Sequence, residues 1–445
     1  MYGKRTVGSL KKKHVGLVVG CIAVLVILVV AVILVPLYQV GRFAPSQHSI
    51  QANFQRLCLA METAYTYFEA KGIDWAELSS RYSKDVATAT KDGDYYRVVA
   101  SMLAEVQDGH TGLLSPSVMS GRYTFATCID LDGTLVVDQI DVVAVAAGLQ
   151  RGDVVLAVGD LPIAAALKAL PPMLVAGSSE GQRLSKAARV VLGTTGDSLS
   201  VVVCGIDGER KLYFNRPASP LTGTPVPIPN LGPRITGRLL PSGIGVIAIP
   251  DFEGGNGHDL VAEFDAVLHT MMDAPAIIVD VRGNGGGSTL ISDRIAGRFL
   301  SSAFTYGREY YTKRLVLRFW SAWYDYRVKP RGVTYQGKVV ILTDVRCVST
   351  TENFIVALVD SGRAHTVGQR TGGSSGNPMR FMLTGGAFVR FSTGAFHRLD
   401  GTLLEGQGIA ADIEVAWTVD DIRSGHDPDL ETAEKSLLCG FGSSN

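Results

Sequence analysis

Two apolar runs, each followed by a turn and an amphipathic stretch, constrain the fold of this chain most. Residues 275–284 (PAIIVDVRGN) and 337–344 (GKVVILTD) are typical of buried strands, and apolar residues at helical spacing follow each turn. Strand–helix alternation continues from residue 243 onward, which implies right-handed crossovers and a largely parallel sheet. Since sites in such sheets lie beyond the carboxyl ends of the strands, we expect both turns to border one site.

The second turn presents Ser349 at the start of the helix-like stretch 350–360. A hydroxyl at a strand-to-helix turn lies at the end of the sheet, where free backbone N–H groups of the next residues can face a bound oxygen. This arrangement suits a nucleophilic serine. Serine is also a favoured helix N-cap, and on this stretch alone a cap is the simpler interpretation.

The first turn contains Gly285, Gly286 and Gly287, and consecutive glycines let backbone N–H groups approach a ligand closely. A phosphate cradle would need a following Lys-Ser/Thr pair or G-x-G-x-x-G spacing, and Ser288 breaks both patterns. An oxyanion hole, in which N–H groups stabilise a tetrahedral intermediate, is a second interpretation. A tight turn with glycines for packing is the third.

Residues 15–38 contain no charged or amide side chain. At about 1.5 Å per residue this run exceeds the roughly 30 Å hydrocarbon core of a bilayer. Five basic residues and no acidic residue precede it, which places the N-terminus in the cytoplasm. The run is too long for a cleaved signal peptide. We expect a cytoplasmic basic tail (1–14), a single transmembrane signal anchor (15–40), and a large part on the extracytoplasmic side, whether periplasmic, cell-surface or lumenal.

The composition is that of a globular chain with two or three domains, since 46% of its 445 residues are apolar and 19% are charged. A formal net charge of zero argues against a nucleic-acid partner. The six cysteines lie far apart, without CxxC or Cys/His ligand spacing, so we expect free thiols and no metal site. No motif for a cofactor is present.

Residues 58–121 are predicted to form an N-terminal helical region, because apolar residues recur at 3–4 spacing. Its last helix runs into the turn signal Asp108-Gly109, which we expect to leave His110 exposed just past the helix end. Residues 122–216 then change to strand–turn–strand patterns around a helical stretch. The segment AGLQRGD in this module, followed by an apolar strand, resembles the PDZ domain, which binds extended peptides at a sheet edge. A structural β module without a ligand is the alternative.

Two segments are predicted to be linkers. Residues 41–57 follow the apolar run, and residues 217–242 are rich in Pro, Gly and Thr. A further stretch, 305–336, is basic and aromatic and interrupts the strand–helix alternation. The stretch 305–336 could form a lid, a membrane-facing surface or a subunit contact, and the sequence does not distinguish these roles.

Six motifs occur in the order seen in the S41 family of serine peptidases, which includes the C-terminal processing (tail-specific) proteases and the tricorn core proteases. The resemblance covers about residues 60–430. It implies that residues 243–440 form an α/β catalytic core of the ClpP/crotonase type, joined to the helical region and an inserted PDZ-like module. The motifs are DGHT (108–111), AGLQRGD (147–153), IIVDVRGNGGG (277–287), VVILTDVRCVSTTENF (339–354), VGQRTGG (367–373) and LLEGQGIAADIEV (403–415).

The resemblance also indicates a subgroup. The processing proteases use a Ser–Lys dyad, but the stretch 371–376 (TGGSSG), where that lysine would fall, contains none. The tricorn-like subgroup uses a Ser, a His from a DGHT-like motif and a Glu from an EG-x-G-I motif. The matching positions are Ser349, His110 and Glu405, although the proline usual before the aspartate of the last motif is Ala411 here.

On this assignment the chain is a membrane-anchored serine endopeptidase that hydrolyses a peptide or protein substrate through an acyl-enzyme. His110 would act as the base for the Ser349 hydroxyl, and Glu405 would fix the imidazole tautomer and stabilise the imidazolium. The N–H groups expected to hold the oxyanion are those of Gly286, Gly287 and Thr350.

Three alternatives remain. Glu352, one helical turn past Ser349, is another carboxylate, which we expect on the solvent or cap side of its helix. The chain would otherwise be a catalytically inactive member of the family, acting as an anchored peptide-binding or scaffold protein. A nucleotide-binding enzyme that uses the glycine turn would lack a P-loop lysine and a ribose-binding acid.

Overall fold

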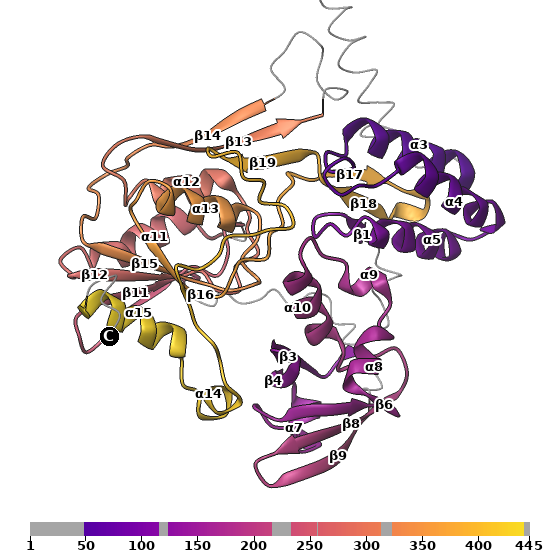
Figure 1. The fold of residues 1–445 in the computed structure, drawn as a ribbon, viewed down its shortest axis with the longest axis horizontal. Coiled ribbons are helices and arrows are strands. Elements are labelled where there is room, and N and C mark those ends of the chain that lie inside the picture. The colour runs from indigo at the N-terminus through magenta and orange to yellow at the C-terminus, as the bar shows by residue number, and fades with distance from the viewer. Residues whose placement is uncertain (1–48, 115–122, 216–232, 256, 313–322, 440–445) are drawn as a thin grey trace, which may run out of the picture.

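The computed structural model (Figure 1) contains three regions: an N-terminal group of helices, a β-rich module and an α/β core. The predicted tail and signal anchor lie outside the residues that it describes. Within those residues, no helix is both long enough and apolar enough to span a bilayer. The described residues are 49–114, 123–215, 233–255, 257–312 and 323–439.

The α/β core is built on a six-stranded sheet in the order β10-β11-β12-β15-β16-β20. All neighbours from β11 to β20 pair in parallel, and only β10 runs antiparallel. This confirms the predicted α/β core with a mostly parallel sheet. The strands are β10 (Thr236–Leu239), β11 (Gly245–Ala248), β12 (Ala276–Asp280), β15 (Lys338–Thr343), β16 (His365–Gly368) and β20 (Ile413–Glu414).

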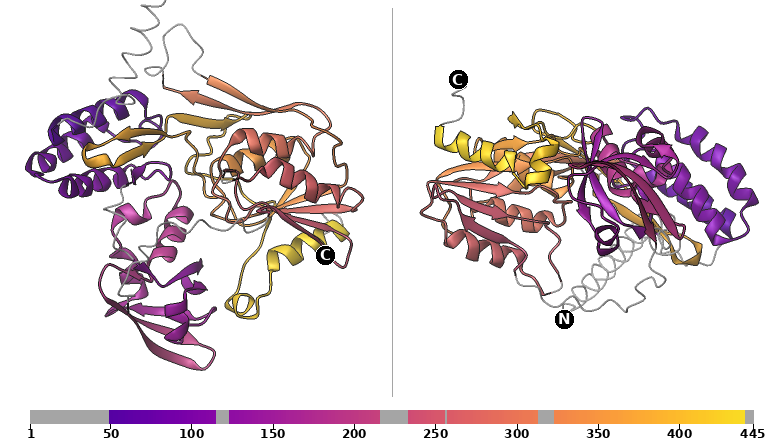
Figure 2. Two further views of the ribbon diagram at one scale, coloured as in Figure 1. Left: turned by 180° about the vertical axis from the view of Figure 1, so that it is seen from behind. Right: turned by 90° about the horizontal axis from the view of Figure 1, so that it is seen from below.

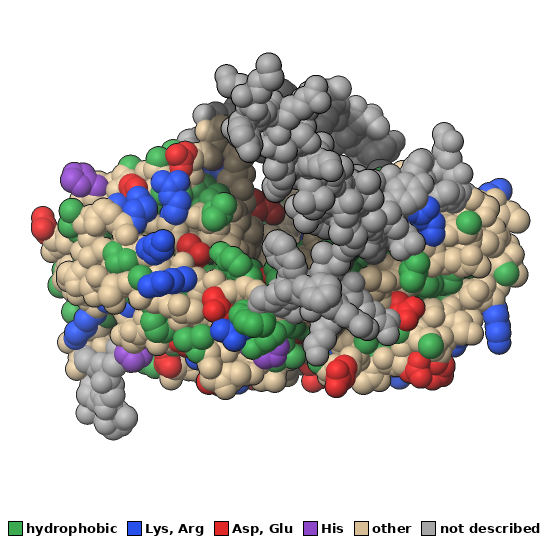
Figure 3. All heavy atoms as spheres, turned by 90° about the horizontal axis from the view of Figure 1, so that it is seen from above, with side chains coloured by type: hydrophobic (Ala, Val, Ile, Leu, Met, Phe, Trp, Pro, Cys, Tyr) green, Lys and Arg blue, Asp and Glu red, His purple; other side chains and the backbone are tan. Residues whose placement is uncertain are grey.

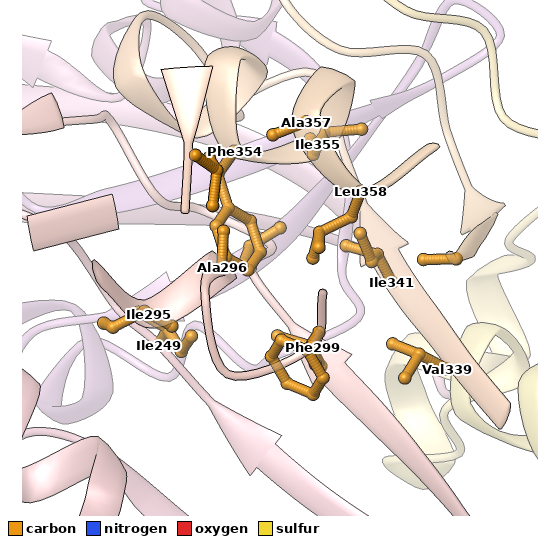
Figure 4. Packing of buried hydrophobic residues seen from close by; sticks show 14 of the residues in the cluster. Ile249, Ile295, Ala296, Phe299, Val339, Ile341, Phe354, Ile355, Ala357 and Leu358 are labelled. Atoms are coloured by element: carbon orange, nitrogen blue, oxygen red, sulfur yellow. The ribbon is translucent and has the colours of Figure 1, made fainter. Parts of the chain in front are cut away.

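Helices cover both faces of this sheet because successive residues of each strand point to opposite sides. Ile277 and Ile341 pack on one side with helices α11 (Leu260–His269), α12 (Thr289–Ala296) and α13 (Thr350–Val359), as Figure 4 shows in part. Ile278 and Val340 pack on the other side with α15 (Pro428–Cys439), which follows α14 (Val419–Ser424). The sheet is therefore buried on both faces, as its continuous apolar runs predict.

The N-terminal helices share a core with strands from the far end of the sequence. They are α3 (Ile50–Ala64), α4 (Trp75–Thr88) and α5 (Asp92–Glu105). A small antiparallel sheet, β1-β18-β17, packs on them, and its β17 (Met379–Met382) and β18 (Phe388–Phe391) bury Phe381 and Phe391 against Leu57. β1 (Gly112–Leu114) continues from α5. Figure 2 shows this unit and α15 at opposite ends of the molecule.

The β-rich module has its own apolar core. Its strands are β3 (Ala126–Leu131), β4 (Thr134–Ile140), β5 (Val154–Val158), β6 (Leu161–Pro162), β8 (Ser198–Gly205) and β9 (Gly208–Asn215). Its short pair is β2 (Tyr123–Thr124) with β7 (Gly193–Thr194). Its helices are α7 (Val142–Ala146), α8 (Ile163–Lys168), α9 (Pro172–Val175) and α10 (Glu180–Val190). In Figure 1, α9 and α10 lie between these strands and α5.

The aromatic insertion forms a hairpin in its described parts. β13 (Phe304–Tyr311) pairs antiparallel with β14 (Trp323–Val328) and with β19 (Gly394–Arg398). A 3₁₀ turn, η2 (Thr384–Gly386), joins β17 to β18. On the face drawn in Figure 3, basic and acidic side chains are interspersed, in keeping with the zero net charge.

Both predicted linkers prove partly regular where they are described. α3 begins at Ile50, inside the predicted linker 41–57, because Ser49 caps the helix and Phe54 is buried in the core. β10 lies inside the predicted linker 217–242, because antiparallel pairing with β11 gives its backbone hydrogen-bond partners. Composition alone does not reveal such pairing.

Candidate active site

Ser349 lies between β15 and α13, beyond the carboxyl end of the sheet, as the sequence predicts. Its backbone is left-handed, with φ +60° and ψ −128°. A helix N-cap normally has extended backbone angles, so capping alone does not require this conformation. Strain of this kind costs about 1–3 kcal/mol and concentrates at functional sites. The geometry therefore favours a functional serine over a simple cap.

The glycine turn packs directly against this serine. A Cβ on Gly286 would lie 2.9 Å from the Ser349 Cβ, and a Cβ on Gly287 would lie 2.3 Å from the Phe252 carbonyl carbon. Both glycines have positive φ, +99° and +140°. Only glycine fits both the space and the backbone angles here.

The N–H groups of the predicted oxyanion hole differ in their engagement. The Gly286 N–H already donates to the Asn284 Oδ1 at 2.9 Å. Within the described residues the Gly287 N–H has no hydrogen-bond partner. The Thr350 N–H starts α13 and so has no acceptor within the helix. The geometry leaves Gly287 and Thr350 as the stronger candidates for binding an oxyanion.

Glu352 is fully buried on the cap side of its helix, one of the two positions expected for it, and does not face solvent. The segment 371–376, defined here as the strap, runs past the start of α13 and encloses it. One Glu352 oxygen accepts from the Thr371 hydroxyl (2.5 Å) and the Gly373 N–H (2.9 Å). The other accepts from the N–H groups of Ser374 (3.0 Å) and Ser349 (3.3 Å). Burial raises the pKa of Glu352 to about 7, and these four donors oppose the rise.

His110 is also buried, not exposed as its position after a helix suggests. The His110 Nδ1 lies 2.9 Å from the Ser374 Oγ. The backbone N–H of His110 donates to the buried Asp108 carboxylate at 2.8 Å. Burial lowers the pKa of His110 to about 4; the Asp108 charge opposes this, while Arg390 and Lys186 add to it. The imidazole is neutral at pH 7, the state that a general base requires.

Glu405 is buried and pairs with Lys71, whose Nζ lies 2.8 Å from its Oε1. Its Oε2 accepts the Ser375 N–H at 3.1 Å. Burial raises the pKa of Glu405 to about 8, the Asp108 charge adds to this rise, and Lys71 opposes it. Sequence reasoning missed Lys71, and no signal along the chain links it to a residue so far away in sequence.

The strap connects the three predicted catalytic residues. The Ser349 N–H donates to the Ser374 carbonyl at 2.7 Å, while His110 meets the Ser374 side chain and Glu405 meets the Ser375 N–H. In the described part of the chain, no hydrogen bond joins His110 directly to Ser349 or to Glu405. The structure thus gathers all three residues around the strap, and their catalytic roles stay a prediction.

The arrangement suits acyl transfer. A strained serine packs against the glycine turn, and a neutral buried imidazole and two buried carboxyl groups lie around the same strap. Among the described residues, no group of three His, Cys, Asp or Glu side chains could hold a metal ion. The chemistry available from these side chains is that of a nucleophile with an acid–base partner.

Comparison with known proteins agrees with this geometry. Residues 243–415 match the model of peptidase family S41, and residues 46–104 match the C1 domain of tricorn protease. The tail-specific protease of Haemophilus influenzae is 23% identical over 381 residues, which cover 79% of this chain and 50% of that protein. Tricorn protease homolog 2 of Streptomyces coelicolor is 29% identical over 203 residues, which cover 44% of this chain and 15% of the homolog. The chain thus spans half or less of the length of these relatives.

A solved structure shares the fold. Mature CPAF complexed with lactacystin superposes with a TM-score of 0.69 at 16% identity, covering 88% of this chain and 98% of that one. The family match includes Ser349, Glu405 and the glycine turn, and the tricorn C1 match covers most of the N-terminal helices. Residues 243–415 of the chain therefore form a peptidase family S41 domain, and the relatives that match this chain in sequence are a tail-specific protease and a tricorn protease homolog.

Proposed function

We propose that this chain is a serine endopeptidase that cleaves peptide bonds through an acyl-enzyme formed on Ser349. The observation that carries the proposal is the strained Ser349 backbone packed against the Gly286–Gly287 turn. In the proposed mechanism the N–H groups of Gly287 and Thr350 hold the oxyanion, and donors of this kind stabilise the tetrahedral intermediate. Removing one such donor typically costs a factor of about 10²–10³ in kcat.

His110 is the proposed general base and Glu405 the proposed orienting carboxylate. A neutral imidazole can accept the proton that leaves the Ser349 hydroxyl as its oxygen attacks the scissile carbonyl. The resulting imidazolium then returns this proton to the leaving amine, and a water molecule releases the acyl group. For direct transfer, the Ser349 hydroxyl takes the place that Ser374 now occupies at the His110 Nδ1.

The site is proposed to act on the extracytoplasmic side of a membrane, anchored through residues 15–40. This rests on the length of the apolar run and the basic residues before it. The module 122–216 is proposed to be PDZ-like and to present an extended peptide to the site. Its helix α10 begins beside the strap, where Ser179 donates to the Gly372 carbonyl at 2.7 Å.

The proposal is tested with the full-length protein in detergent, incubated with a library of unstructured peptides and with a serine-reactive phosphonate. Ser349→Ala is expected to abolish both cleavage and labelling, and His110→Ala to lower the rate by a factor of about 10³ or more. Ser436→Ala, on α15, is the matched control and keeps full activity.

Full turnover by Ser349→Ala would overturn the assignment. Peptide binding without cleavage by the unsubstituted protein would favour the non-catalytic alternative. Residual cleavage by Ser349→Ala at less than a thousandth of the original rate still supports Ser349 as the nucleophile, since binding and the oxyanion donors remain.

A further inference from the structure

Three hydroxyl and amide groups form a continuous chain of hydrogen bonds that ends on His110. The Gly109 N–H lies 2.8 Å from the Ser178 Oγ, and the Ser178 Oγ lies 3.2 Å from the Ser374 Oγ. The Ser374 Oγ in turn lies 2.9 Å from the His110 Nδ1. The side chains of Ser178, Ser374 and His110 are buried, so water does not compete freely for these contacts.

The first bond of this chain has a fixed direction, because a backbone N–H can only donate. Ser178 accepts from Gly109 and donates its hydroxyl proton to the Ser374 oxygen, with the Glu405 carboxyl as a second partner of the Ser178 side chain. Ser374 then accepts from Ser178 and has one proton left, which faces the His110 Nδ1. A nitrogen that accepts a hydrogen bond carries no proton, so the neutral ring carries its proton on Nε2.

We propose that Ser374 and Ser178 are positioning residues that hold His110 with Nδ1 unprotonated and ready to accept a proton. This rests on the proposed function, in which His110 is the general base. When the Ser349 hydroxyl replaces Ser374 at this nitrogen, the O–H bond of Ser349 breaks and an Nδ1–H bond forms. The Nε2–H is then available to an orienting carboxylate.

Ser178 brings the β-rich module into this arrangement. It lies in the turn between α9 and α10, at the edge of the module nearest the helices, and its N–H donates to the Gln182 side chain at 2.7 Å. A Cβ on Gly109 would lie 2.4 Å from the Ser374 Oγ and 2.5 Å from the Gln182 Oε1. The turn at Gly109, the strap and the start of α10 therefore pack closely. A shift of the α9–α10 turn would change the position of Ser374, the hydrogen-bond partner of His110.

The charged groups that face His110 come from three elements. Asp108 precedes it in the same turn, Arg390 lies on β18 and donates to the His110 carbonyl at 3.0 Å, and Lys186 lies on α10. Neither Ser374 nor Ser178 is ionisable. Removing the Ser374 hydroxyl therefore leaves these three charges in place, so a changed titration in Ser374→Ala reports the hydrogen bond itself, whereas Ser178→Ala also removes a hydrogen bond to Glu405.

The first test reads the tautomer without any substrate. The full-length protein, labelled with ¹⁵N-histidine and carrying Ser349→Ala, is examined at pH 7 by two-bond ¹H–¹⁵N correlation, with His110→Gln to assign the ring. We expect an unprotonated Nδ1 and a protonated Nε2. With Ser374→Ala added, we expect an averaged mixture of tautomers, whereas Ser392→Ala, which removes a buried hydroxyl beside the strap, changes nothing. A protonated Nδ1, or an unchanged tautomer without Ser374, overturns the inference.

The second test is the pH profile of peptide cleavage. A donor to Nδ1 stabilises the neutral ring, so Ser374→Ala is expected to raise the pKa of His110 and move the acid limb of kcat/KM to higher pH. We also expect kcat to fall about 10- to 100-fold with little change in KM. Ser374→Thr restores the original limb, and Ser178→Ala gives a smaller shift in the same direction.

Failure of the positioning role of Ser374 and failure of the proposed function give different results. If Ser349→Ala is inactive but Ser374→Ala and Ser392→Ala share the original pH profile, the inference is wrong and the proposed function stands. If Ser349→Ala remains fully active, the proposed function is wrong, whatever the tautomer of His110.

Discussion

Substitution of Glu352 is expected to change the stability of the protein and its activity in different ways. Its carboxylate accepts four hydrogen bonds in a fully buried position, two from the strap backbone, one from the Thr371 hydroxyl and one from the N–H of Ser349, the proposed nucleophile. Glu352→Gln keeps the shape of the side chain but replaces one acceptor oxygen with an NH₂ group. Two of the four N–H or O–H donors then face another donor, so the turn that holds Ser349 loosens.

The effect on stability follows from the pKa. Burial raises the pKa of Glu352 from 4.5 to about 7, and a shift of this size corresponds to about 3 kcal/mol at 1.36 kcal/mol per unit. The folded state therefore binds a proton between these pH values that the unfolded state does not, and the wild-type protein loses stability as pH rises through this range. Glutamine never ionises, so the variant does not lose this contribution.

We expect the stability of Glu352→Gln relative to the wild-type protein to rise by about 3 kcal/mol between pH 5 and pH 8, while the donors that face its NH₂ group lower its stability at both pH values. Its kcat at pH 8 should nevertheless fall about 100-fold, the cost of misplacing a nucleophile by about 1 Å. Melting curves at both pH values and peptide cleavage at pH 8 measure this. Glu431→Gln, an exposed carboxyl on α15, is the control. A stability difference from wild type that stays the same at both pH values, or a variant that keeps wild-type kcat, would contradict this prediction.

Three further substitutions test other parts of the site and core. Gly286→Ala should reduce kcat at least 100-fold because its Cβ would meet the nucleophile, whereas Gly285→Ala, with open space around it, should retain activity in the same peptide assay. Arg282→Met should lower stability by about 3–5 kcal/mol, since it leaves three aspartates facing one another, while Arg308→Met at an exposed pair should change the melting temperature far less. Lys71→Met should raise the pKa of Glu405 further and move a limb of the pH–rate profile to higher pH. An unchanged profile would exclude Glu405 from the reaction.

Local sequence predicted the parts of the fold and site that local interactions determine. Apolar runs and turns placed β12 and β15 with Gly287 and Ser349 at their ends, since strand direction and crossover handedness leave few other arrangements. The oxyanion candidates followed because they are chain neighbours of these turns. The family motifs added His110, which no short-range pattern singles out as catalytic.

Contacts between distant segments account for what the sequence did not predict. The burial of His110 depends on Ser374 and the α9–α10 turn, and helix-end patterns describe only the neighbouring residues. Glu352 was expected on the solvent or cap side of its helix; it lies on the cap side, and helical spacing does not reveal that the strap passes over it and buries it. Lys71 reaches Glu405 only through the packing of the N-terminal helices. The signal anchor, the PDZ-like character of the module and the roles within the triad remain predictions.

The shared core of the N-terminal helices also governs when this protein can fold. Helices α3 to α5 end before residue 107, yet their apolar faces are covered by residues 381–395. At about 5–20 residues per second, a ribosome needs roughly 15 to 55 s to make the stretch from Val106 to Phe381. During synthesis these helices must wait with their apolar side chains uncovered, or be held by a chaperone. His110 follows directly after them, so the nascent chain cannot assemble the proposed site until Ser349, the strap and Glu405 have also been made.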